Sequence, residues 1–564
     1  MTAMIQLLDR LLDFAMPHLV AAPILVPMLT AALMLLLQER HRRIKSALSV
    51  VSGLVGLVVA LALLRWVNAS ATGTGAGSIG VYLAGNWQAP FGIVLVADRL
   101  SAMMVALTGV VAFAASIYST SRWDRAGVHF HPLLQLQLMG LNGAFLTGDL
   151  FNLFVFFEVM LASSYGLLLH GSGRNRVSAG LHYIAINLAA SSLFLIGAAL
   201  LYGATGTLNM ADMGLRISQL APEDRGLVHA GAAILATAFF AKAGAWPLNF
   251  WLVPGYSAAV PPVGAVFALL TKLGLYTLLR TWSMLFPHDA GASAQFGQSV
   301  LLGLGMATLA VAALGIVGTQ KLAQLASYSV LISAGTLLTA VGMGQPAVWS
   351  GALFYLLNSS LAAAAFFLLV DVIERWRNAG MSIAPHELAG RAPFLSEDLK
   401  VQEDVNLDDD QQALYGRAIP AGVAFLGLSF VACTLLITGL PPLAGFVGKL
   451  SMLMGLFEGA MDRSSWLFFA LVLVSGFLTL VALARAGIRY FWTQPHGALP
   501  SLPALEVLPI AVLLSCCVGL TALAEPVMQH VRATADALSH PALYRDAVMG
   551  ARQIPGPTLK EAAP

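Results

Sequence analysis

Four charged side chains stand inside long apolar segments of this chain. Glu158 lies in FNLFVFFEVMLASSYGLLL, Lys242 in AFFAKAGAWPLNFWLVP, Lys272 in FALLTKLGLYTLL and Lys449 in PPLAGFVGKLSML. A charge at the centre of a bilayer costs about 2.5–3.5 kcal/mol on insertion scales, so such residues are rare and usually functional. Lysine suits proton transfer because burial weakens its hold on the proton and a nearby carboxylate strengthens it. These residues predict a proton or ion pathway through a membrane protein.

Glu158 is the predicted partner of Lys242, because the fifth and seventh apolar segments can be neighbours in one bundle. The alternative is a static buried salt bridge, which seldom repays the cost of desolvating both charges. Lys272 lies near the middle of its segment, whereas snorkelling to the membrane surface needs a position near a helix end. Lys449 follows a break in its segment, so snorkelling remains open for it.

Polar residues near the lysines are predicted to support proton transfer. The candidates are His182, Tyr328, Ser329, Asn358 and Ser359. Histidine titrates near neutral pH and suits proton entry, whereas the other four can hold waters that pass protons between the last two lysines. The alternative for each is helix packing, because Ser and Asn commonly join membrane helices.

The composition indicates a polytopic α-helical membrane protein. Of the 564 residues, 58% are hydrophobic and 10% are charged, where a soluble domain has about 25% charged residues. The net charge of +2 gives no sign of a nucleic-acid partner. The three cysteines, Cys433, Cys516 and Cys517, lack the spacing of a metal site. No phosphate-binding loop or dinucleotide motif is present, so we expect no cofactor and no metal.

About fourteen segments are long and apolar enough to span a bilayer. They lie near residues 18–37, 47–66, 97–119, 128–147, 149–170, 176–203, 226–252, 258–283, 296–317, 322–342, 348–374, 418–456, 464–492 and 503–524. Residues 68–96 alternate like strands and predict a small hairpin outside the membrane.

Prolines predict breaks in the seventh and twelfth segments. Pro247 and Pro254 follow Lys242, whereas Pro441 and Pro442 precede Lys449. Two proline-broken segments with a lysine each, five helices apart, predict two five-helix repeats of inverted topology. Broken backbone is tolerated in a membrane only where it faces protein or water.

Four regions follow from this pattern. They are residues 1–127 with helices 1–3, 128–283 with the first repeat, 296–492 with the second repeat and a hydrophilic cytoplasmic insert at 376–417, and 493–564 with helix 14 and the tail. Arginines and lysines gather in alternate loops, and such loops face the cytoplasm. We therefore expect an inner-membrane protein with both termini on the outer, periplasmic side.

The chain resembles the antiporter-like membrane subunits shared by respiratory complex I and the multisubunit Mrp (Sha, Pha) cation/proton antiporters. The resemblance is carried by GDLFNLFVFFEVMLASSYGLLLHG, AFFAKAGAWPLNFWLVPGYSAAVPPVGAVFALLTKLGLYTLLR, KLAQLASYSVLISAG and ITGLPPLAGFVGKL. Within this family, LAGNWQAPFGIVLVADRLSA and FNLFVFFEV look most like the D-type subunits. The resemblance extends over nearly the whole chain. It implies fourteen helices, of which helices 4–8 and 9–13 form the two inverted repeats.

By motif position, the family's charged residues fall on Glu158, Lys242, Lys272 and Lys449. Asn358 stands where several relatives have a histidine, so the relay between the last two lysines would depend more on water. The resemblance implies a secondary transporter subunit, not an enzyme, in which proton influx drives efflux of Na⁺ or K⁺. It also implies partner subunits of the A, B, C, E, F and G types.

Two other functions remain open from the sequence. One is a proton-pumping subunit of complex I or a membrane-bound hydrogenase, which would share the relay but take its energy from electron transfer. The other is a structural scaffold whose charges only join helices.

Overall fold

The computed structural model describes residues 18–69, 79–127, 129–381, 420–459, 461–492 and 502–553. The helices of the first half are α2 (Ala22–Leu36), α3 (Arg42–Ala69), α4 (Arg99–Ser119), α5 (Phe130–Leu146), α6 (Leu150–Leu168), α7 (Arg174–Thr205), α8 (Met210–Gln219), α9 (Arg225–Ala243), α10 (Leu252–Ala258) and α11 (Pro261–Leu285). Those of the second half are α12 (Gln298–Gly318), α13 (Leu322–Met343), α14 (Pro346–Met381), α16 (Ala421–Thr438), α17 (Ala444–Phe457), α18 (Arg463–Gly487), α19 (Ala504–Ala522), α20 (Ala524–Ser539) and α21 (Ala542–Met549).

All fourteen predicted apolar segments are helical. Among the described residues, twelve helices are long and apolar enough to cross a membrane. Two further apolar helices among the described residues, α2 and α17, are shorter, with 15 and 14 residues, and α5, with 17 residues, also carries polar side chains. The predicted multi-pass helical class is therefore confirmed.

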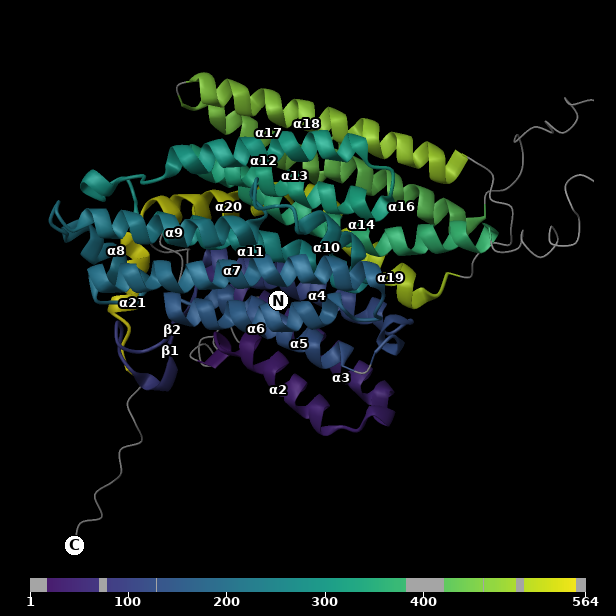
Figure 1. Cartoon of the computed structure of the whole chain (residues 1–564), viewed down its shortest axis with the longest axis horizontal. Helices are drawn as coiled ribbons and strands as arrows, with labels where there is room; N and C mark the ends of the chain where they lie inside the picture. Colours follow the sequence, from purple (N-terminus) through teal and green to yellow (C-terminus); the bar gives the residue numbers. More distant parts are fainter. Residues whose placement is uncertain are drawn as a thin grey trace, which may run out of the picture.

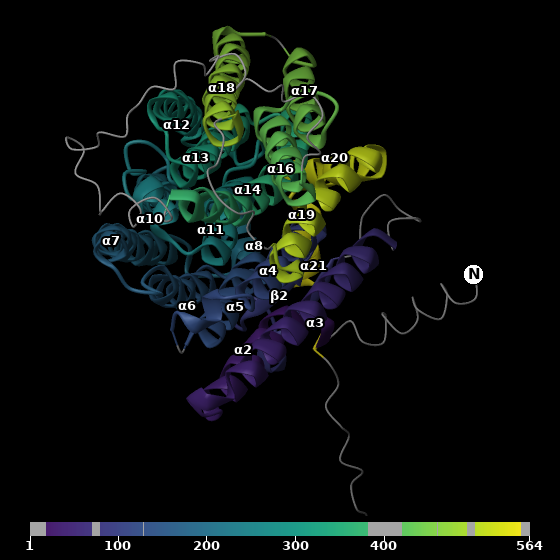
Figure 2. The same ribbon diagram turned by 90° about the vertical axis from the view of Figure 1, so that its right-hand side faces the viewer.

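The long helices run side by side along the longest axis of the molecule (Figure 1). Seen at right angles to that view, α11 and α14 lie in the middle, with α5 to α7 on one side and α12, α13 and α16 to α18 on the other (Figure 2). Nearly every residue of α11 is buried, because this helix is apolar on all its faces and packs on neighbours all round. Lys272 is thus held at the centre of the bundle.

Two of the helical paths are interrupted where prolines predicted a break. α9 ends at Ala243, and the chain stays irregular from Gly244 until α10 begins at Leu252. α16 ends at Thr438, and α17 begins after Pro441 and Pro442. Gly244 and Gly439 end the first halves with positive φ angles of 73° and 77°, which glycine adopts without strain. Both breaks are confirmed.

Pro254 is not part of either break. It lies in the first turn of α10, where a proline removes no helical hydrogen bond.

The predicted hairpin is confirmed, because β1 (Gly80–Leu83) pairs antiparallel with β2 (Val94–Ala97).

Three helices were not predicted: α8 in the loop after α7, and α20 and α21 in the tail. These helices are amphipathic and not continuously apolar, so a search for membrane-spanning runs passes over them. At the start of the predicted insert, α14 continues to Met381, and residues 382–417 lie outside the described residues. The inverted repeats and the domain limits stay predictions.

Candidate proton pathway

Glu158 and Lys242 lie near each other on α6 and α9 without a direct ion pair between their side chains. Lys242 is 4% exposed, and its Nζ lies 4.7 Å from the ring centroid of Phe157, the residue before the glutamate. The Ser191 hydroxyl, on α7, donates a hydrogen bond to Glu158 Oε1. The carboxylate is close enough to act electrostatically on the lysine. The two charges therefore interact electrostatically without forming a direct ion pair.

The broken helix gives Lys242 a second source of stabilisation. Lys242 is in the last turn of α9, two residues before the left-handed Gly244. The last carbonyls of a helix carry partial negative charge, which favours a cation nearby. A lysine at this position can hold a proton in an apolar surrounding without a fixed counter-ion.

Gly274 brings α11 against α9 at this point. A Cβ atom at Gly274 would lie 2.6 Å from the backbone nitrogen of Ala243, so only glycine permits this approach. Ala243 follows Lys242, and Gly274 is two residues after Lys272. The close crossing therefore places the segments that carry the two lysines side by side.

Lys272 begins a series of polar contacts that crosses from α11 to α14. The lysine is 1% exposed and donates a hydrogen bond to Ser333 Oγ on α13. Thr336 follows three residues later on the same helix and so faces the same way. The Thr336 hydroxyl donates to the Ile332 oxygen of its own helix, and its side chain is near enough to Tyr355 on α14 to interact with it. Each of these side chains is buried.

Lys449 lies at the other end of this series. Its Nζ stands 5.7 Å from the ring centroid of Tyr355. The ammonium group also donates a hydrogen bond of 2.8 Å to the backbone oxygen of Thr438 at the end of α16. This bond, and a side chain that is 7% exposed, rule out snorkelling for Lys449.

The break between α16 and α17 supplies acceptors for these polar groups. The amides of Gly439 and Leu440 both donate to the oxygen of Leu435, which leaves the following carbonyls without their helical partners. Asn358 Nδ2 donates to the freed oxygen of Leu436 at 3.2 Å, and its own Oδ1 is buried with no partner. A buried, unpartnered amide oxygen near broken backbone is a suitable place for an ordered water.

Among the described residues, the other predicted supporting residues form no hydrogen bond with a lysine of this series. The exposed His182 bonds only the Ser178 oxygen of its own helix. Ser329 and Ser359 also bond carbonyls of their own helices. Tyr328 is half-buried, and its ring lies against Gly315 of α12.

The linking residues that the sequence interpretation missed are Ser191, Ser333, Thr336 and Tyr355. Their only signal is spacing. Thr336 is three residues after Ser333, and Tyr355 is three residues before Asn358, which places each pair on one helix face. Serines and threonines are common in membrane helices, so spacing alone could not single these out.

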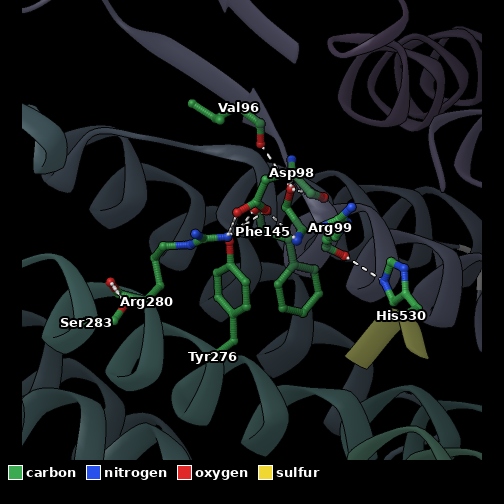
Figure 3. A network of polar contacts seen from close by, with 9 residues as sticks. Val96, Asp98, Arg99, Phe145, Tyr276, Arg280, Ser283 and His530 are labelled. Atoms are coloured by element: carbon green, nitrogen blue, oxygen red, sulfur yellow. Dashed lines mark hydrogen bonds and ion pairs between the residues drawn. The ribbon is translucent and has the colours of Figure 1, made fainter. Parts of the chain in front are cut away.

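Beyond Lys272, the same face of α11 carries a buried polar network. Tyr276 and Arg280 follow at intervals of four residues (Figure 3). Tyr276 Oη donates to the Phe145 oxygen at 2.6 Å, and Arg280 bonds the carboxylate of Asp98 at 2.7 Å. Asp98 also caps α4 by accepting from the backbone nitrogen of Ser101. The network fixes this end of α11 against α4 and α5, so Lys272 sits on a rigid element.

The chemistry that this arrangement supports is the binding and passing of protons. Among the described residues, no group of three or more His, Cys, Asp or Glu side chains is placed to hold a metal ion. The buried groups are amines, hydroxyls and amides at the centre of a helical bundle. Such groups exchange protons along hydrogen bonds and bridging waters.

Comparison with known proteins agrees with this description. Residues 147–401 match the family model described as NADH:quinone oxidoreductase/Mrp antiporter, TM. A protein of Rhizobium meliloti (strain 1021), named as the probable D-type subunit of a K⁺/H⁺ antiporter, is 49% identical over 95% of this chain and 98% of its own. The D-type subunit of a Na⁺/H⁺ antiporter from Alkalihalophilus pseudofirmus is 32% identical over 95% of this chain and 100% of its own.

A solved structure shares the fold along most of the chain. A chain in the structure of the Mrp complex from Dietzia sp. DQ12-45-1b superimposes with a TM-score of 0.77 at 25% identity. The match covers 94% of this chain and 99% of that one. With its sequence relatives, its helical architecture and its buried lysines, this chain belongs to the NADH:quinone oxidoreductase/Mrp antiporter membrane-subunit family, in the group of D-type antiporter subunits.

Proposed function

We propose that this chain is the proton-translocating D-type subunit of a multisubunit monovalent cation/proton antiporter. The proton path runs through Glu158, Lys242, Lys272 and Lys449, in that order or its reverse. The observation that carries the proposal is the buried series of polar side chains that leads from Lys272 on α11 toward Lys449 beside the break between α16 and α17. Static charges placed for packing would need no polar side chains between the two lysines.

Each part of the path has a distinct task. Glu158 sets how strongly Lys242 holds its proton, because the two charges act on each other without a direct bond. Lys272 passes a proton by way of the Ser333 hydroxyl, and Lys449 is reached by way of Tyr355. Waters complete the gaps, above all beside the free amide oxygen of Asn358.

The transported cation and the partners follow from the relatives. The two curated relatives are named for K⁺/H⁺ and Na⁺/H⁺ exchange, so we propose that proton influx drives efflux of Na⁺ or K⁺. Their designation as subunits supports a multisubunit assembly, in which we expect partners of the A, B, C, E, F and G types. The isolated chain is not expected to catalyse exchange.

The proposed orientation places the arginine-rich loops in the cytoplasm of a cell whose inner membrane holds the complex. Arg42 and Arg43 at the start of α3, and Arg174 at the start of α7, support this orientation. The hairpin and the C-terminal helices lie at the opposite end of the bundle (Figure 1). Both termini would then face the periplasm.

The test is the pH change that a cation induces in inverted vesicles from antiporter-deficient cells expressing the full set of subunits. Na⁺ and then K⁺ are added to the wild type and to Lys242→Ala, matched for the amount of assembled complex. We expect a response in the wild type that is lost in the variant, since the lysine carries the proton. The effective cation identifies the exchanged ion.

Three outcomes would contradict the proposal. A Lys242→Ala variant with undiminished transport per assembled complex would remove this lysine from the path. A variant in which only the amount of complex falls would favour a structural role for the charge. An assembled wild-type complex without any cation response would favour the redox-driven alternative.

A further inference from the structure

A hollow of about 700 Å³ lies at the arginine-rich end of the molecule, where the link between α2 and α3 approaches the start of α19. Its basic lining residues are Arg40, His41, Arg42, Arg43 and Arg125. We propose that this hollow binds the headgroup of an anionic glycerophospholipid whose headgroup carries hydroxyl groups, as in phosphatidylglycerol. The hollow lies away from the lysine series, so the proposal does not depend on the proposed transport function.

Asp124 is the one acidic residue among those that line the hollow, and it forms no ion pair with the arginines in the described part of the chain. The four arginines are exposed, and none forms an ion pair with a side chain that the structure describes. His41 Nδ1 is buried and has no hydrogen-bond partner. Arginine binds phosphate through two parallel N–H donors, so several arginines around one hollow favour a phosphate group.

The acidic residue of the hollow points to hydroxyl groups on the same ligand. Asp124 is 7% exposed, and its Oδ2 accepts a hydrogen bond of 2.9 Å from Ser46. Its Oδ1 is buried and unpartnered. A phosphate oxygen would be repelled there, whereas a headgroup hydroxyl can donate to it. The hollow thus offers donors for a phosphate and an acceptor for a hydroxyl.

The helices beside the hollow supply a surface for acyl chains. Leu33 and Leu36 on α2 are 54% and 83% exposed, and Ile44 and Val51 on α3 are 48% and 56% exposed. α2 has 15 residues and spans about 22 Å, less than the roughly 30 Å of a hydrocarbon core. The hollow at its end therefore lies near the hydrocarbon boundary, where basic pockets between membrane helices bind anionic headgroups.

If these arginines served only to orient the chain in the membrane, they would explain the positive charge of this face. They would not explain why four arginines gather around one hollow. Basic residues anywhere in these loops would orient the chain equally well. Arg174, for example, is on the same face but outside the hollow. The arginines, the unpartnered polar groups and the exposed apolar residues of α2 and α3 all lie at this hollow. A lipid needs this combination, because it has a charged headgroup and apolar chains.

The test measures lipid retained by the purified complex in native mass spectrometry, after reconstitution with phosphatidylcholine and equal amounts of phosphatidylglycerol and phosphatidic acid. The variant is Arg42→Gln/Arg125→Gln, and the matched control is Arg174→Gln/Lys321→Gln, which removes two charges outside the hollow. We expect phosphatidylglycerol to be retained in preference to both other lipids by wild type and control. Its retention should fall about tenfold or more in the variant, because charge-assisted bonds to phosphate are lost.

Several results would overturn the assignment. Equal retention by the variant and the control would show that the hollow is not the site. Preference for phosphatidic acid would remove the role of the hydroxyl groups. Heat stabilisation of the wild type by inorganic phosphate as large as that by phosphatidylglycerol would indicate a simple anion site.

If the glutamine variant fails to assemble, a second variant tests the proposal. Arg42→Lys/Arg125→Lys keeps both charges but removes the planar two-donor group. Retention of phosphatidylglycerol should still fall in this variant, and retention equal to the wild type would contradict the proposed headgroup contact.

Discussion

At the residue scale, Tyr355 is the side chain that joins the two halves of the lysine series. Its hydroxyl is near enough to Thr336 of α13 to interact with it, and the ammonium group of Lys449 lies over its ring. The ring and the hydroxyl therefore have separate tasks. The ring stabilises a cation by its electron-rich face, whereas the hydroxyl can donate and accept a proton.

Tyr355→Phe separates these tasks because it removes the hydroxyl and keeps the ring. We expect cation-induced proton movement in inverted vesicles to fall by about tenfold or more, as is common when a group that transfers protons is removed. Ser329→Ala is the control on the neighbouring helix, because Ser329 bonds only its own backbone, and it should behave as the wild type. Equal rates in both variants would show that protons bypass Tyr355.

At the element scale, close helix crossings and one buried ion pair fix where the lysines lie. Gly274 lets α11 approach α9, and Gly448 lets α17 approach α14, since a Cβ there would lie 2.9 Å from the Tyr355 Cα. Arg280 and Asp98 hold the far end of α11. These contacts keep three lysine-bearing elements in register with one another.

Gly274→Ala should destabilise the complex by about 1–3 kcal/mol, because the added methyl group meets the backbone of α9. The measurement is the melting temperature of the purified complex. Gly303→Ala on α12 is the control, because a Cβ there meets nothing within 4 Å. If Gly303→Ala lowers the melting temperature as much as Gly274→Ala does, the cause is the replacement of a helical glycine and not the close approach of α11 to α9.

The ion pair between Asp98 and Arg280 gives a second prediction at this scale. Asp98→Asn keeps an N-cap residue for α4 but leaves the Arg280 charge, which is 4% exposed, without its partner. We expect a loss of about 3 kcal/mol in stability, typical of breaking one side of a buried pair.

Asp462→Asn changes the N-cap of α18, where the serines at 464 and 465 lower the aspartate pKa to about 2 but no ion pair is present. It should have a much smaller effect than Asp98→Asn. The double variant Asp98→Asn/Arg280→Gln should recover part of the lost stability, and no recovery would argue against the ion pair as the cause.

At the scale of the whole molecule, the two ends of the bundle differ in structure. The hairpin, α8, α20 and α21 cover one end, whereas the arginines of the α2–α3 link and of α7 stand at the other (Figure 1). Figure 2 shows α2 and α3 at the edge of the bundle. Several leucines and valines of these two helices are exposed. A fixed orientation in the membrane follows from this asymmetry.

Labelling with a membrane-impermeant thiol reagent checks the orientation. Gln529→Cys on α20 and Asn175→Cys on α7 replace exposed residues at opposite ends, in a background with the three native cysteines changed to serine. Gln529→Cys should react from the periplasm and Asn175→Cys only in inverted vesicles. The reverse pattern would invert the proposed orientation and the direction of the proton path.

The sequence alone determined the class, the spans and the charged residues of this protein. A run of about 20 apolar residues has to span a bilayer as a helix, because lipid offers no hydrogen bonds to an open backbone. Proline and glycine ended the helices at Gly244 and Gly439 through local geometry. Buried lysines were visible because apolar segments so rarely contain them.

Only the tertiary structure decided which polar residues connect the lysines. Ser329 and Ser333 both donate to a carbonyl of their own helix, but Ser333 also accepts a hydrogen bond from Lys272. The Tyr328 ring lies against Gly315, whereas the Tyr355 ring lies under Lys449. Which helix face turns inward depends on contacts between segments far apart in the chain, such as Gly274 with Ala243. A uniformly apolar helix carries no polar stripe that reveals its inner face, so packing has to select that face.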